Sequence, residues 1–180
     1  MNQDRIRWNQ KYINGEHPTD PSEIVRKFYL LASKGRVLDI AAGTGRNALF
    51  LANQGFDVDA IDISEVGLSR LSGAHPRLNL ICADLDVFDI PCERYSLILN
   101  IRYLNRRLFP YIKEGLIPGG VLIFETCLES TDMNESATSC RDYLLRENEL
   151  LHSFLSLKIF FYQEAKNEDN KDIASLAAVK

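Results

Sequence analysis

Two aspartates and two glycines are spaced along the sequence as in a nucleoside-binding site. Asp39 lies inside a short apolar run, Gly43 and Gly45 follow it in a small-residue turn, and Asp62 ends the next apolar run. Glycines between a strand and a helix leave backbone N–H groups open to a ligand. A carboxylate at the end of the neighbouring strand can accept both hydroxyls of a ribose. These residues predict a pocket for an adenosine-like group.

Two cofactors use such a pocket, NAD and S-adenosylmethionine (SAM). Residues 43–48 fit the loose dinucleotide pattern G-x-G-x-x-[GA], which by itself is weak evidence. Asp39 favours SAM, because a carboxylate just before the turn would repel a pyrophosphate but suits a sulfonium and an α-amino group. An NAD-binding oxidoreductase domain stays open as the alternative.

Residues 37–64 resemble motif I of the class I SAM-dependent methyltransferases, with Ala41 in place of the usual first glycine. The resemblance implies that SAM is bound and that S-adenosylhomocysteine is the product. Asp84 would accept from adenine, although a turn-capping aspartate is the alternative, and Arg46 is a candidate for the cofactor carboxylate. The expected cofactor-binding residues are Trp8, Tyr12, Asp39, Ala41, Gly43, Gly45, Arg46, Asp62, Ile63, Ala83, Asp84, Leu85 and Asn100.

The apolar run 95–101 corresponds, by the same resemblance, to the strand whose end faces the transferred methyl group. No N/D-P-P-Y/F motif and no Pro-Cys pair follows it, so the known routes to nucleobase and glutamine acceptors are missing. A small soluble acceptor, attacked by SN2 displacement, is expected, and a SAM-binding module without catalysis is a further alternative. No catalytic residue is identified; the acceptor-side candidates are Asn100, Arg102, Tyr103 and Arg106.

Arg102 and Arg106 have two interpretations. They can hold an anionic acceptor, or they can pair with carboxylates at the surface. Trp8 and Tyr12 are four residues apart and therefore share a face of a helix. This pair also has two interpretations. This aromatic pair can close over the methionine end of the cofactor, or it can simply fix an N-terminal helix to the body.

Composition narrows the function further. The chain has 180 residues, 46% hydrophobic and 26% charged, with a net charge of −4, as in an ordinary globular protein. The acidic balance argues against nucleic acid or an acidic membrane as a partner. No apolar run could span a bilayer and no signal peptide is evident, so a cytoplasmic location is expected. Four scattered cysteines give no metal motif, and monomer and homodimer both stay open.

The elements that must position these residues follow from the apolar pattern. We expect one domain, 1–180, with a helical cap at 1–34 and a Rossmann-like core at 35–180. Asp20, Pro21 and Glu23 predict an N-cap and capping box for a helix reaching Ala32. A further helix is expected at 143–154, and 129–140 is either a lid or an inert loop. The resemblance implies a three-layer α/β/α fold with a seven-stranded, mostly parallel sheet in the order 3-2-1-4-5-7-6, the last strand antiparallel.

Overall fold

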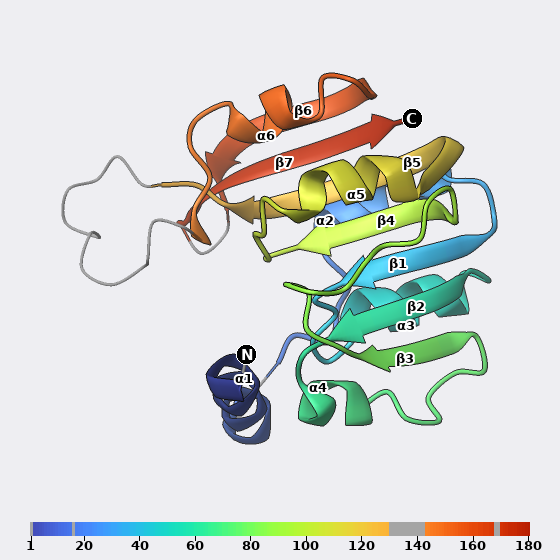
Figure 1. Cartoon of the computed structure of the whole chain (residues 1–180), viewed down its shortest axis with the longest axis vertical. Helices are drawn as coiled ribbons and strands as arrows, with labels where there is room; N and C mark the ends of the chain where they lie inside the picture. Colours follow the sequence, from blue (N-terminus) through green and yellow to red (C-terminus); the bar gives the residue numbers. More distant parts are fainter. Residues whose placement is uncertain (1, 16, 130–142, 168–169) are drawn as a thin grey trace.

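In the computed structural model the strands form one sheet with helices on both faces (Figure 1). The structure describes all residues except 1, 16, 130–142 and 168–169. The sheet order is β3-β2-β1-β4-β5-β7-β6, with β7 antiparallel to both of its neighbours. Both features confirm the predicted topology. The strands are β1 Arg36–Ile40, β2 Asp57–Asp62, β3 Leu78–Cys82, β4 Tyr95–Ile101, β5 Leu116–Cys127, β6 Lys158–Lys166 and β7 Asp172–Val179.

Two hydrophobic cores separate the three layers. One core joins the sheet to α5 and α6, and the other joins its opposite face to α2, α3 and α4. All seven residues of β4 are buried, as expected of a central strand covered on both faces. The helices are α1 Asn2–Asn14, α2 Glu23–Phe28, α3 Arg46–Asn53, α4 Glu65–Ser69, α5 Leu108–Gly115 and α6 Glu149–Ser153, with a 3₁₀ turn at Tyr29–Leu31.

The strand register brings the predicted site residues to one edge of the sheet. Ile40 of β1 lies beside Ile61 of β2 and Asn100 of β4, and Asp62 lies beside Cys82. The turns that follow β1, β2, β3 and β4 therefore meet, as carboxyl ends of parallel strands do at a switch point of such a sheet. In Figure 1 this edge is on the left, next to α1.

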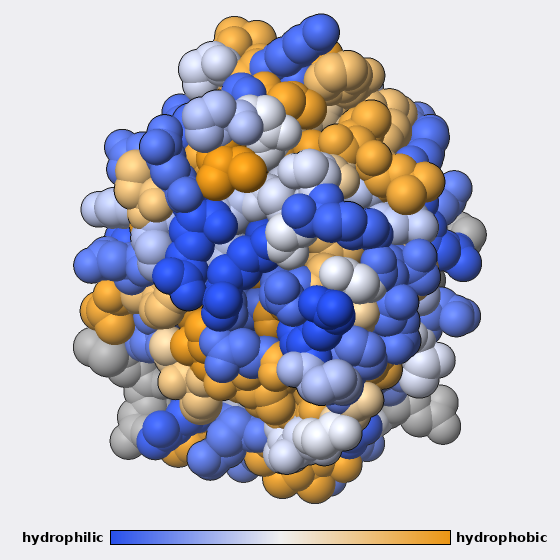
Figure 2. All heavy atoms as spheres, turned by 90° about the vertical axis from the view of Figure 1, so that its right-hand side faces the viewer, coloured by the Kyte–Doolittle hydropathy of each residue, from blue (hydrophilic) through white to orange (hydrophobic). Residues whose placement is uncertain are grey.

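The opposite edge of the sheet carries a buried polar cluster. The Asp59 carboxylate accepts from Arg36 Nε at 2.7 Å, from Arg36 Nη2 at 2.6 Å, from Asn79 Nδ2 at 2.8 Å and from Tyr95 Oη at 3.1 Å. Figure 2 faces this side, where hydrophilic residues cross the centre and hydrophobic ones lie above and below them. With every donor aimed at one carboxylate, the cluster ties β1, β2, β3 and β4 together away from the ligand edge.

The capping box predicted at Asp20 is wrong. The helix begins at Glu23, its N-cap is Ser22, and the Ser22 side chain makes no capping hydrogen bond. Ser22 N instead donates to Asn47 Oδ1 at 2.8 Å, so a contact with α3 fixes the start of the helix. The helix also ends at Phe28, before the predicted Ala32.

The predicted helix at 143–154 is shorter than expected. Leu145 forms a β-bridge with Leu128, and α6 is confined to Glu149–Ser153. Asn148 has a φ of 59°, a left-handed conformation that an α-helix cannot continue through. The predicted lid at 129–140 lies outside the described residues except for Glu129.

Candidate functional site

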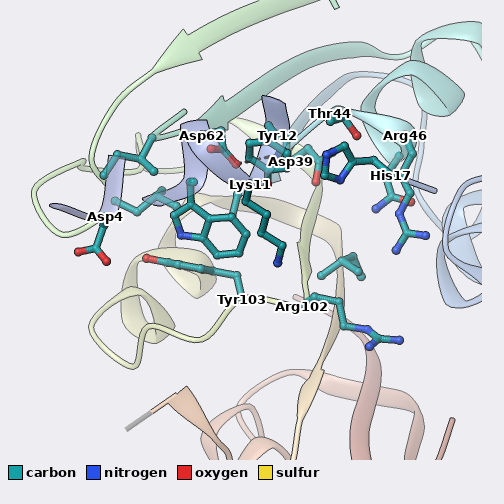
Figure 3. Close-up of a pocket in the computed structure, with 18 of the residues that line it drawn as sticks. Asp4, Lys11, Tyr12, His17, Asp39, Thr44, Arg46, Asp62, Arg102 and Tyr103 are labelled. Atoms are coloured by element: carbon teal, nitrogen blue, oxygen red, sulfur yellow. Dashed lines mark hydrogen bonds between the residues drawn. The ribbon is translucent and has the colours of Figure 1, made fainter. Parts of the chain in front are cut away.

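A cavity of about 350 Å³ opens at the carboxyl ends of β1, β2 and β4, beneath α1 (Figure 3). Its volume is within the range of sites for small ligands. Figure 3 shows Asp39, Asp62 and Tyr12 together, with Arg46 and His17 at one end and Asp4 and Tyr103 at the other. The predicted residues that line it are Trp8, Tyr12, Asp39, Ala41, Gly43, Arg46, Asp62, Ile63, Asp84, Leu85, Arg102 and Tyr103.

The turn between β1 and α3 is left-handed at three positions. Ala41, Gly43 and Gly45 have φ values of 54°, 59° and 77°. A Cβ on Gly45 would lie 2.0 Å from Leu71 Cδ1, so a side chain there requires the Leu71 side chain to move. Ala41 adopts a conformation that suits glycine better, and this explains the glycine usual at that position in the resembled motif.

Asp62 fixes this turn from the end of β2. Its Oδ2 accepts from Gly43 N and its Oδ1 from Ser64 N, both at 2.8 Å. Each carboxylate oxygen has a second lone pair, so Asp62 can still accept from a ligand in the cavity. Burial raises the pKa of Asp62, and the N–H groups of Ser64 and Gly43 partly offset this increase.

Asp39 faces the same cavity with one oxygen unused. The residue is only 2% exposed, and its Oδ2 has no hydrogen-bond partner among the described residues. Burial and the nearby Asp62 charge raise its pKa to about 7, against smaller opposing effects of the Ala48 N–H and Arg46. A buried acceptor without a donor is rare in folded proteins and indicates that a cationic or donor group completes the site.

Helix α1 forms the roof of the cavity. Trp8 and Tyr12 stack with their ring centroids 5.7 Å apart, and Tyr12 lies edge-on to His17 at 5.0 Å. Lys11 Nζ lies 4.4 Å from the Trp8 ring. Burial and the Asp62 charge raise the pKa of Tyr12, so its hydroxyl stays protonated.

The far wall carries positive charge. Arg102 has a φ of 60°, and its Nε lies 3.2 Å from Glu125 Oε1, an ion pair that leaves the residue on the cavity wall. Burial and then the like charge of Arg102 lower the pKa of Arg46. Lys11 and Arg102 both line the cavity, Lys11 from α1 and Arg102 from the segment after β4. This end of the cavity therefore favours a negatively charged group.

The family of the chain follows from comparison with known proteins. Residues 4–174 match the family model described as tellurite resistance protein TehB. The chain belongs to the TehB family. A protein of Haemophilus influenzae described as a probable S-adenosyl-L-methionine-dependent methyltransferase TehB is 26% identical over 176 residues, covering 92% of this chain and 58% of that protein. The chain therefore spans less than two thirds of the length of this relative.

Solved structures show the same fold. The crystal structure of TehB from H. influenzae superposes with a TM-score of 0.74 at 22% identity, covering 98% of this chain and 66% of that one. A Burkholderia thailandensis 1,6-didemethyltoxoflavin-N1-methyltransferase, solved with 1,6-didemethyltoxoflavin and S-adenosylhomocysteine, gives 0.72 at 16% identity, covering 98% and 86%. The predicted class I methyltransferase fold is confirmed. The predicted cofactor, SAM, is the one named in the description of the H. influenzae relative.

Four predicted site residues of this TehB-family chain do not line the cavity: Gly45, Ala83, Asn100 and Arg106. Asn100 is 1% exposed, and its Nδ2 donates to the Tyr103 carbonyl at 2.6 Å, so it shapes the segment after β4 from behind. Ala83 N is already bonded to the Asp62 carbonyl at 3.0 Å. The Asn100 side chain and the Ala83 backbone N–H therefore lie behind the cavity wall and support it.

Arg106 follows the second of its two interpretations, pairing with a carboxylate. Its Nε lies 2.5 Å from Glu149 Oε1, and its Nη2 donates to the Leu144 carbonyl at 2.8 Å. Asp84 makes the turn contact of its second interpretation, since its Oδ1 accepts from Asp86 N at 2.9 Å. The residue also lines the cavity, and its contact with adenine stays a prediction.

Sequence reasoning missed several residues of the cavity wall. On α1, Asp4 and Lys11 lie one turn before and after Trp8, and the helical period that pairs Trp8 with Tyr12 would have found them. The others carry no comparable signal in the sequence. The full set that was missed is Asp4, Arg7, Lys11, His17, Pro18, Ala42, Thr44, Asn47, Asp86, Ile101 and Tyr143.

The part of the chain that the structure describes contains no group of three or more His, Cys, Asp or Glu side chains that could hold a metal ion. Within the same residues, no helix combines the length and apolar character that crossing a membrane requires.

Proposed function

We propose that this chain transfers the methyl group of SAM to a small acceptor by SN2 displacement. The observation that carries the proposal is the unpartnered, buried Asp39 oxygen beside Asp62 in one cavity. Asp39 would face the cationic amino acid end of SAM, Asp62 the ribose hydroxyls, and Asp84 the adenine amino group. Arg46 would hold the carboxylate. SAM supplies a methyl group already activated on a sulfonium.

The acceptor is proposed to carry negative charge. Lys11 on α1 and Arg102 after β4 both line the cavity, and so does Tyr103, the next residue after Arg102 (Figure 3). Cationic side chains can orient an anion for in-line attack, and a soft nucleophile then needs placement and desolvation more than a strong base. Tellurite and selenite belong to this chemical class, and the family description names tellurite resistance.

Isothermal titration calorimetry tests the cofactor. We expect S-adenosylhomocysteine to bind with micromolar affinity and NAD not to bind. NAD binding without S-adenosylhomocysteine binding would instead support an oxidoreductase domain. Substituting Asp39 by Asn must weaken binding if its carboxylate faces the cationic end.

A methyl-transfer screen tests catalysis and the acceptor. With SAM as donor, tellurite, selenite, thiols and carboxylates should include a substrate, and neutral amines should react more slowly. Binding of S-adenosylhomocysteine without turnover of any acceptor would favour a SAM-binding module that lacks catalysis. Faster turnover of amines than of anions would refute the proposed role of Lys11 and Arg102.

A further inference from the structure

Helix α1 contributes several residues to the cavity wall, but the helix would not be stable without contacts to the rest of the protein. It contains 13 residues, mostly polar, and an isolated helix of this length is marginal in water. Its main packing partner is α4, and Figure 1 shows the two helices side by side. The position of the roof, with Trp8, Lys11 and Tyr12, therefore depends on how α1 is seated on α4.

The seat contains a slot that only glycine leaves open. A Cβ on Gly67 of α4 would lie 3.0 Å from Tyr12 Cδ2, 3.1 Å from Tyr12 Cε2 and 2.9 Å from the Gly43 carbonyl oxygen. On the other side of the ring, a Cβ on Gly43 would lie 2.7 Å from Tyr12 Oη. The Tyr12 ring thus lies against two glycines, one on α4 and one in the turn that faces the cofactor.

Polar contacts surround the same slot. Ser64 Oγ donates to Asn9 Oδ1 at 2.6 Å and accepts from Gly67 N at 3.0 Å. Arg70 Nη2 donates to the Tyr12 carbonyl. Ser64 N also donates to Asp62, the residue proposed to bind the ribose. Ser64 therefore contacts both α1 and the cofactor site.

We propose that Ser64 and Gly67 are positioning residues that seat α1, through Asn9 and Tyr12, over the cofactor and acceptor end of the cavity. The proposal rests on the proposed function for its consequence, which is that α1 must be seated for SAM to bind tightly. The glycine is otherwise unfavourable in α4, because alanine is the better helix former. The slot explains why glycine is present: it lowers the helix propensity of α4 but leaves room for the Tyr12 ring.

Substitution of Gly67 by Ala separates the two effects. By helix propensity alone, Gly67→Ala should leave ligand binding unchanged. If the contact with Tyr12 matters, the new Cβ of Gly67→Ala should displace the Tyr12 ring and move α1 away from α4. If the seated fraction falls to roughly one tenth, the dissociation constant for S-adenosylhomocysteine rises about tenfold.

Trp8 reports the position of α1 without any ligand, because it is the only tryptophan in the chain. In Gly67→Ala we expect its emission to shift to longer wavelength and its quenching by acrylamide to increase. Tyr12→Ala should give the same changes. In the double variant Gly67→Ala/Tyr12→Ala, affinity should be no lower than in Tyr12→Ala alone, because both act through one contact.

Two results would overturn the proposal. One is a Gly67→Ala protein with unchanged Trp8 fluorescence and unchanged affinity. The other is an equal loss of affinity from Gly67→Ala in the Tyr12→Ala background, which would assign the effect to the Gly43 carbonyl. A wild-type protein that fails to bind S-adenosylhomocysteine would instead refute the proposed function, since the fluorescence test needs no ligand.

A second pair of variants decides the matter if Gly67→Ala does not fold. Asn9→Ala removes the contact with Ser64 and should raise the dissociation constant roughly threefold. Gln10→Ala, at the next and exposed position of α1, is the matched control and should leave affinity and fluorescence unchanged. Equal behaviour of the two variants would show that the contacts between α1 and α4 do not position the roof.

Discussion

Substitution of Asp39 by Asn is predicted to stabilise the ligand-free protein and weaken cofactor binding. Asp39 is buried, and burial followed by the charge of Asp62 raises its pKa from 3.8 to about 7. The native state therefore holds a proton that the unfolded chain releases. The contribution of the Asp39 carboxyl to the free energy of unfolding is largest below about pH 4. It decreases as the pH rises and is lost above about pH 7.

The size of the effect follows from the two pKa values. Each pH unit between them corresponds to about 1.4 kcal/mol, so the ionised carboxylate costs the native state about 4 kcal/mol at pH 8. At pH 5 the cost is about 2 kcal/mol, because only the part of the interval below that pH contributes. Asparagine removes the ionisation and keeps the shape. Asp39→Asn should therefore increase the free energy of unfolding by about these amounts.

Urea denaturation at pH 5 and pH 8 measures the difference, provided that the slope with denaturant is unchanged. Asp59→Asn is the matched control on β2. Burial raises the pKa of Asp59, but hydrogen bonds from Arg36 and Asn79 outweigh it and leave the pKa below its usual value. Asp59→Asn should destabilise the protein at both pH values. An Asp39→Asn effect that is equal at pH 5 and pH 8, or destabilising at pH 8, would refute the reasoning.

Other substitutions test the rest of the site. Asp62→Ala should weaken S-adenosylhomocysteine binding by about 1–3 kcal/mol in calorimetry, because a ribose loses a charged acceptor; an unchanged dissociation constant would remove Asp62 from the site. Gly45→Ala should lower the free energy of unfolding by about 1–3 kcal/mol, since φ is 77° and the new Cβ meets Leu71. Arg106→Ala should change stability by less than about 1 kcal/mol, as for a partly exposed ion pair with Glu149, and leave affinity unchanged.

The sequence predicted the strands from their apolar runs, the strand order from the resemblance, and about half of the residues that line the cavity. Buried parallel strands appear as continuous apolar runs, and the carboxyl ends of such strands must meet. For this reason the apolar pattern alone places Asp39, Gly43 and Asp62 together. Asp84 followed from the resemblance to the methyltransferase motif.

Prediction failed where a long-range contact overrides a local signal. The residues at 20–23 match a capping box, but Asn47 from α3 bonds Ser22 N and moves the helix start. The leucines of 143–154 have helical spacing, but pairing of Leu145 with Leu128 holds part of this segment extended. The partners of Arg106 also depend on tertiary packing that no periodicity reveals.

The unpaired carboxylate and the polar helix above it are two parts of one arrangement. Asp39 costs free energy while the cavity lacks a cation, and α1 is a polar helix whose main packing partner is α4. A ligand that binds the native state stabilises it in proportion to its occupancy. SAM, with its sulfonium and ammonium, would offset the Asp39 charge and give Tyr12 and Trp8 a surface to cover. Cofactor binding and the seating of α1 on α4 should therefore favour each other, because both assemble the same cavity wall.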